Sequence, residues 1–124
     1  MQRKRTTIQP YGITVKPRIM LHITESDYKH IVSEALNGAQ DRCGSVETEV
    51  EIEKDNDAMV VVEVRFDYDR EYNDEGLGYI DVKTDIYNFR ARVAGSYDGD
   101  GVEEECDFSD DRLDKAYNEA VRYL

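Results

Sequence analysis

The eight residues from Val46 to Glu53 alternate without exception between a β-branched side chain and glutamate. Successive side chains of a β-strand point to opposite faces, whereas a helix would spread the same glutamates around its circumference. The segment is therefore predicted to be a strand with one buried face and one acidic face. The buried face would hold Val46, Thr48, Val50 and Ile52, and the acidic face Glu47, Glu49, Glu51 and Glu53.

A second alternating segment follows after a short polar break. Its apolar residues also occupy even positions: Val60, Val62, Val64, Phe66 and Tyr68. Two antiparallel strands that both bury their even residues need a connecting loop of odd length, because paired positions then sum to an even number. The loop Asp55-Asn56-Asp57 meets this condition. It predicts a hairpin in which Ile52 lies opposite Val60 and Val50 lies opposite Val62.

The period of two slips by one residue within residues 80–97. The first apolar set is even-numbered, with Ile80, Val82, Thr84 and Ile86, and the second is odd-numbered, with Tyr87, Phe89, Ala91, Val93 and Tyr97. A β-bulge near Ile86 to Asn88 would produce this slip within one strand, and a break into two strands is the alternative.

Residues 96–111 combine two Asp-Gly pairs with many carboxylates. An EF-hand calcium loop would need an oxygen ligand at position 5 and glutamate at position 12. Counted from Asp98, these positions hold Val102 and Ser109. We therefore interpret the segment as a tight turn, a fourth strand and a helix cap. The resulting hairpin would place Arg90 and Arg92 across from the acidic residues Glu103, Glu105 and Asp107.

Two segments have the apolar spacing of amphipathic helices. The first begins after Thr24, which can cap the helix together with Asp27, and ends at Asn37-Gly38. The second is capped by Ser109 and carries one apolar stripe: Leu113, Ala116, Tyr117, Ala120, Val121 and Leu124. Each helix has one apolar side and is expected to cover the apolar side of the sheet.

The predicted fold is a two-layer α+β domain, in which a four-stranded antiparallel meander packs against two helices on one face. A short strand at residues 19–23 precedes the first helix, so the order is (β)-α-β-β-β-β-α. Residues 1–18 have five basic residues and no acid, and all 28 acidic residues follow them. We therefore expect a basic N-terminal arm, 1–18, and one acidic domain, 19–124.

The net charge of −12 argues against a DNA- or RNA-binding surface and against attraction to an anionic membrane. His22 and His30 have no nearby set of ligands with zinc-site spacing, and no serine or cysteine stands in a recognisable catalytic motif. The sequence predicts neither a metal nor another cofactor, and it leans against an enzyme. No signal peptide opens the chain, and Cys43 and Cys106 do not suggest a disulfide framework, so the expected location is cytoplasmic.

The leading functional hypothesis is a small accessory protein that presents its acidic sheet face to a basic partner. The partner would be another protein or a second subunit of a homodimer, contacted by the basic arm. The residues assigned to this interaction are Glu47, Glu49, Glu51, Glu53, Glu63, Arg3, Lys4 and Arg5. Two alternatives remain open: a ligand-binding or weakly enzymatic domain with a pocket between helices and sheet, and an inhibitor that mimics nucleic acid.

Overall fold

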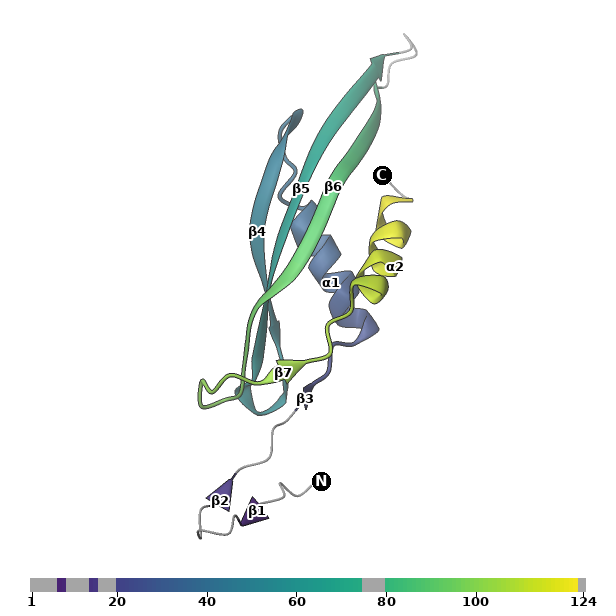
Figure 1. Cartoon of the computed structure of the whole chain (residues 1–124). Helices are drawn as coiled ribbons and strands as arrows, with labels where there is room; N and C mark the ends of the chain where they lie inside the picture. The colour runs from purple at the N-terminus through teal and green to yellow at the C-terminus, as the bar shows by residue number, and fades with distance from the viewer. Residues whose placement is uncertain (1–6, 9–13, 16–19, 75–79, 123–124) are drawn as a thin grey trace.

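The computed structural model describes residues 7–8, 14–15, 20–74 and 80–122. It has the predicted α+β architecture, with an antiparallel sheet and two helices (Figure 1). The elements, in chain order, are β1 (Thr7–Ile8), β2 (Thr14–Val15), β3 (Met20–Leu21), α1 (Glu25–Leu36), β4 (Cys43–Glu53), β5 (Met59–Asp74), β6 (Ile80–Tyr97), β7 (Glu105–Cys106) and α2 (Asp110–Val121).

The hairpin between β4 and β5 has the predicted loop and the predicted register. A 3-10 turn at Asp55–Asp57 joins the strands, Ile52 pairs with Val60, and Val50 pairs with Val62. Asn56 and Asp57 take positive φ angles of 59° and 62°. Asparagine and aspartate tolerate this left-handed conformation better than most residues, which explains why a polar sequence forms this turn.

The predicted bulge in β6 is present, and β6 runs as one strand across it. Arg65 pairs with Arg90, whereas Asp67 pairs with Tyr87, so β6 has one extra residue in this interval. Asn88, within it, has a positive φ of 56°. The period therefore slips because of a bulge and not because the strand breaks.

A second register shift in β6 was not predicted. Val61 pairs with Gly95, but Val62 pairs with Val93, which leaves an extra residue at this point of β6. The shift reverses the parity of the residues that follow, so that Ser96 is buried and Tyr97 is 38% exposed. The prediction that Tyr97 points into the core is therefore wrong.

The prediction of a fourth meander strand is also wrong, because the sheet of β4, β5 and β6 has three strands. After Tyr97 the chain makes a tight turn and forms one isolated bridge, Tyr97 to Glu103. It then leaves β6, and β7 pairs in parallel with β3. The backbone N–H of Asp107 donates to the carbonyl of Leu21 at 3.0 Å, which extends this pairing and draws the segment away from Arg90 and Arg92.

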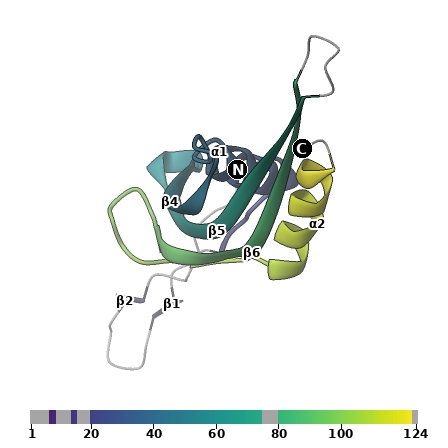
Figure 2. The same ribbon diagram turned by 90° about the horizontal axis from the view of Figure 1, so that it is seen from above.

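Both helices pack on the even-numbered side of the sheet and share its core. Thr24 and Asp27 form the predicted capping box of α1, and Ser109 caps α2. Figure 2 shows the curvature of the sheet, with α1 next to β4 and β5 and α2 beside β6. The largest fully buried side chains of the core come from α1, from β5 and from the residue before the cap of α1: Tyr28, Ile31, Val32, Val60, Val62, Val64, Phe66 and Ile23. Rings of Phe66, Phe89 and Tyr117 continue the core from β5 through β6 to α2.

The hairpin of β5 and β6 extends beyond the end of β4 and beyond the helices (Figure 1). Tyr72 and Val82 pair there and are each 45% exposed. Val82 has the predicted parity, but it is not buried, because no helix covers this part of the hairpin.

The N-terminal segment contains one short antiparallel pair, in which Thr7 of β1 lies opposite Val15 of β2. The sequence had predicted no strand there. Arg3, Lys4 and Arg5 lie outside the described residues. The division into an arm and one acidic domain stays a prediction.

Candidate protein-interaction surface

The acidic row consists of Glu47, Glu49, Glu51 and Glu53 on β4, and all four side chains are exposed. On the other side of the strand, Val50 and Ile52 are buried at 4% and 3% exposure. The strict alternation of the sequence therefore orients the row as predicted, away from both helices. Among the described strands, β4 pairs only with β5 and so forms one edge of the sheet (Figure 1).

One residue of the acidic row is paired with an arginine of the next strand. Arg65 Nη2 donates a hydrogen bond to Glu47 Oε1 at 2.6 Å. Both side chains remain in contact with solvent, since they are 68% and 70% exposed. Glu47 raises the pKa of Arg65 above its ordinary value through this hydrogen bond and its charge. An exposed pair of this kind contributes little to stability.

Glu63, the fifth predicted acidic residue, faces the same side from β5 but is half-buried. It lies directly opposite Glu49, and its carboxylate binds Arg92 Nε of β6 at 2.7 Å. Two carboxylates about 5 Å apart repel by only about 0.8 kcal/mol at full water screening. Arg92 further offsets this repulsion, so the sheet tolerates the pair while Glu49 stays wet.

A hollow of about 290 Å³ lies on the same face at the Asn88 bulge. Asp67 lines it and accepts hydrogen bonds from Asn88 Nδ2 at 2.9 Å and from Ser45 Oγ. These two bonds hold the pKa of Asp67 below its ordinary value. Arg65 and Arg90 also line the hollow, so this end of the face carries both signs of charge.

The opposite end of the face is more apolar than the sequence predicted. Met59 pairs with Tyr97, and Val61 pairs with Gly95, next to Glu53 and Glu51 of the acidic row. The ring of Tyr97 lies over Gly95, since a Cβ at this glycine would come within 2.7 Å of Tyr97 Cε2. The odd positions of Met59 and Val61 in the sequence could have indicated this apolar strip, whereas the position of Tyr97 depends on the second bulge.

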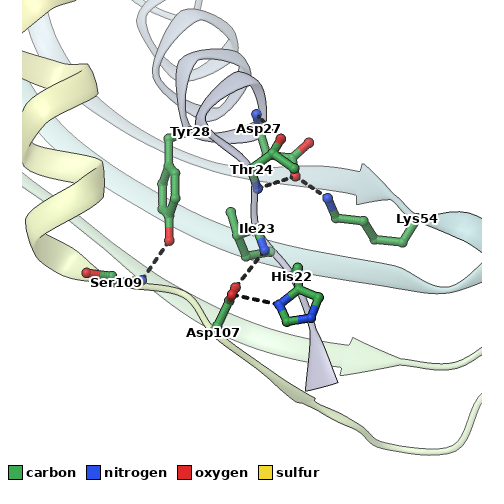
Figure 3. A network of polar contacts seen from close by, with 8 residues as sticks. All are labelled: His22, Ile23, Thr24, Asp27, Tyr28, Lys54, Asp107 and Ser109. Carbon is green, nitrogen blue, oxygen red and sulfur yellow. Dashed lines mark hydrogen bonds and ion pairs between the residues drawn. The ribbon is translucent and has the colours of Figure 1, made fainter. Parts of the chain in front are cut away.

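The end of β4 is fixed to helix α1 by a partly buried ion pair (Figure 3). Lys54 Nζ binds Asp27 Oδ2, and both side chains are less than one-fifth exposed, at 16% and 19%. Burial alone would raise the pKa of Asp27, but Lys54 and the hydrogen bonds with Thr24 outweigh it and lower the pKa. This contact joins Lys54, which follows the last glutamate of the row, to the first turn of α1.

Two further hollows have volumes of about 360 Å³, between α1 and α2, and about 270 Å³, beside the Asp55–Asp57 turn. Neither of them, nor the hollow at the Asn88 bulge, is lined by a described histidine or cysteine. His22 Nδ1 lies 3.0 Å from Asp107 Oδ2, and His30 is exposed. Within the ranges that the structure describes, no three His, Cys, Asp or Glu residues are grouped so that they could hold a metal ion. The helices described here are too short and too polar to cross a membrane.

The arrangement thus brings together the five predicted glutamates on one face, while the three predicted basic residues of the arm lie outside the described ranges. Sequence reasoning missed Arg92 as the partner of Glu63, because it had placed Arg92 opposite a fourth strand. Comparisons with protein-family models, with curated proteins and with solved structures found no match to this chain.

Proposed function

We propose that the chain is a non-catalytic interaction protein of the cytoplasm whose acidic sheet face binds a basic partner protein. The observation that carries the proposal is the acidic row, which places four exposed glutamates on one face of an edge strand. Among the described residues, an arginine pairs with Glu47, and no ion pair engages Glu49, Glu51 or Glu53. Three carboxylates in sequence along the strand are thus available to cations of a partner.

The charge pattern next to the acidic row favours a basic protein segment over mimicry of nucleic acid. Alternate residues of a strand repeat about every 6.8 Å, whereas one DNA strand has a phosphate every 3.4 Å of its axis. A mimic would need a second row of acids on β5 to reach that density. The β5 row contains Glu63 and Asp67 but also Arg65, and Arg90 and Arg92 lie beyond it on β6, so basic side chains interrupt the second row.

The proposed location follows from the thiols. Cys43 is exposed and Cys106 is half-buried, and both are free. Free thiols fit a reducing compartment such as the cytoplasm.

The proposal predicts that loss of charge from the acidic row weakens binding to a defined basic probe. Decalysine binding to the full chain would be measured by fluorescence anisotropy for the triple variant Glu49→Gln, Glu51→Gln, Glu53→Gln. We expect about tenfold weaker binding in low salt, because three exposed charge contacts are lost.

The matched control removes three exposed carboxylates from the helices by Glu34→Gln, Asp114→Asn and Glu119→Gln. Both triple variants have the same net charge. If the control weakens decalysine binding as much as the β4 variant does, binding depends on net charge alone and the acidic row is not the site.

A further inference from the structure

Strand β4 has an unpaired edge. It is the terminal strand of the three-stranded sheet, it is 11 residues long, and within the described part of the chain no strand pairs with its other side. An edge strand offers a row of backbone N–H and C=O groups to any extended segment that lies beside it. This edge is therefore a place where the sheet can accept another strand.

The hydrogen bonds at the two ends of β4 reveal which residues face this edge. Lys54 N–H donates to the carbonyl of Ala58 at 2.7 Å, and the carbonyl of Arg42 accepts from Arg70 N–H at 2.9 Å. The register is unbroken from Cys43 to Glu53, and both of these pairs continue it. Because the hydrogen-bonding direction alternates along an antiparallel strand, even-numbered residues face β5 and odd-numbered residues face the free edge.

The residues that face the free edge are thus the same ones that carry the exposed glutamates. Each of Glu47, Glu49, Glu51 and Glu53 offers a backbone donor and acceptor sideways and a carboxylate on the outer face. From this coincidence we infer that β4 binds an extended segment of a partner protein with Lys or Arg at alternate positions, which joins the sheet as a further strand. The inference rests on the proposed function and specifies the form of the basic partner.

The sheet already contains the cross-strand pairs that such a partner would form. Arg65 lies directly opposite Glu47 in the register, and its guanidinium reaches the carboxylate at 2.6 Å. Arg92 lies directly opposite Glu63, and the two groups are 2.7 Å apart. A cation on an added strand opposite Glu49 or Glu51 would occupy the equivalent position on the other side of β4.

Charge complementarity also selects against two other occupants. Antiparallel pairing of β4 with β4 of a second copy would place glutamates beside glutamates on one face. The basic residues Arg3, Lys4 and Arg5 of this chain are consecutive, so an extended strand would direct two of them at most toward the acidic row. A separate basic segment with alternating cations fits the whole row.

The test uses three synthetic peptides of the same charge and the full chain. The parent peptide alternates lysine and threonine over ten residues, so that all lysines share one face. One derivative is N-methylated on the backbone of every lysine and the other on every threonine. An added antiparallel strand would direct the lysine amides at β4, and an added parallel strand would direct the threonine amides at β4.

Strand addition predicts that one methylated peptide, and not the other, loses affinity. We expect it to bind at least about tenfold more weakly than the parent, because several backbone hydrogen bonds are lost. Equal affinities for all three peptides, or equal losses for the two derivatives, would overturn strand addition while decalysine binding still supports the acidic face. Failure of the parent to bind where decalysine binds would also overturn it, and failure of both would overturn the proposed function itself.

Site-resolved hydrogen exchange by NMR locates the added strand on the protein. The parent peptide should slow exchange at the amides of Glu47, Glu49 and Glu51, which face the free edge, and leave those of Thr48 and Val50, which already bond to β5, unchanged. New protection along β6 instead, with none on β4, would place the bound strand at the wrong edge and refute the assignment.

Discussion

Asn88 shapes the outer face of the sheet at the scale of a single residue. It takes a φ of 56° within the bulge of β6, and its side-chain amide donates a hydrogen bond at 2.9 Å to Asp67 on the neighbouring strand, β5. Asparagine accepts the left-handed region more readily than β-branched residues do. One residue thus combines the backbone conformation of the bulge with a hydrogen bond that holds it against β5.

Replacement of Asn88 separates these two contributions. Asn88→Val should destabilise the protein by about 1–2 kcal/mol, because a β-branched side chain is strained at this φ. Asn88→Gly keeps the backbone relaxed and loses only the hydrogen bond to Asp67, so its loss should be smaller. Urea unfolding of both variants gives the comparison, and equal losses would show that the left-handed backbone is not the cause.

The two bulges differ in how far the sequence reveals them. Around Asn88 the flanking residues are large and apolar, so the change of parity between Ile86 and Phe89 is visible. At the second bulge the following residues are Gly95 and Ser96, whose small side chains have no clear preference for either face. The parity change there could be recognised only from the pairing with β5.

At the scale of elements, Asp107 joins the start of α1 to the segment that leads into α2 (Figure 3). One carboxylate oxygen accepts from the backbone N–H of Ile23 at 2.6 Å, and the other lies 3.0 Å from His22 Nδ1. Beside it, the hydroxyl of Tyr28 accepts from the backbone N–H of Ser109 at 2.8 Å. These contacts fix the parallel pair of β3 and β7 at the base of both helices.

The Asp107 contacts predict a dependence of stability on pH. Burial alone would raise the pKa of Asp107, but the hydrogen bonds from His22 and Ile23 outweigh it and bring the pKa below the ordinary 3.8. A carboxyl whose pKa is lower in the folded state contributes stability above its unfolded pKa and loses it as the pH falls through the folded value. Asp107→Asn should therefore be less stable than the natural chain at pH 6, with a gap that narrows below pH 3.8.

Chemical unfolding at a series of pH values measures this gap. Asp67→Asn is a useful comparison, because the pKa of Asp67 is also lowered but its partners lie on the sheet face, far from β3 and β7 in the chain. A gap for Asp107→Asn that stays constant from pH 6 to pH 3 would contradict a role for the ionised carboxylate.

The sequence predicted the elements whose hydrophobic period is long enough to recognise. β4, β5 and both helices each carry several turns or repeats of their pattern, and their caps and loop follow local rules. β3 and β7 contribute two residues each and pair across more than 80 positions of the chain. The short strand predicted at residues 19–23 contains β3, but no local pattern indicates its pairing with so distant a segment, so the fourth strand was assigned to the nearer neighbour, β6.

At the scale of the whole molecule, 28 acidic and 16 basic side chains leave a net charge of −12 that no internal pairing can remove. The exposed acidic row adds to this excess on one face. Like charges destabilise the compact state by mutual repulsion, and dissolved salt screens that repulsion.

Salt should therefore stabilise this protein. We expect the melting temperature to rise by on the order of 5 °C between about 10 mM and about 500 mM NaCl, as the screening length shortens. The triple variant Glu49→Gln, Glu51→Gln, Glu53→Gln should melt higher than the natural chain in low salt and respond less to added salt. A melting temperature that falls with salt would mean that attractive pairs such as Glu47 with Arg65 dominate the balance.

The candidate surface was predictable to the extent that it lies on one strand. The alternation from Val46 to Glu53 was sufficient to place the glutamates on one face. The free edge was not predictable from this pattern, because strand order depends on which pairs form over the whole sheet. The same is true of Arg92, whose position opposite Glu63 depends on the register of β6.

The pairing of β3 with β7 has a consequence for the order in which the chain can fold. During synthesis, Leu21 and Ile23 leave the ribosome more than 80 residues before residues 105–107, which supply the groups that bind their backbone. The hairpin of β4 and β5 is local and can form while synthesis continues. Residues 20–23 must therefore wait until residues 105–107 have emerged before they reach their final contacts.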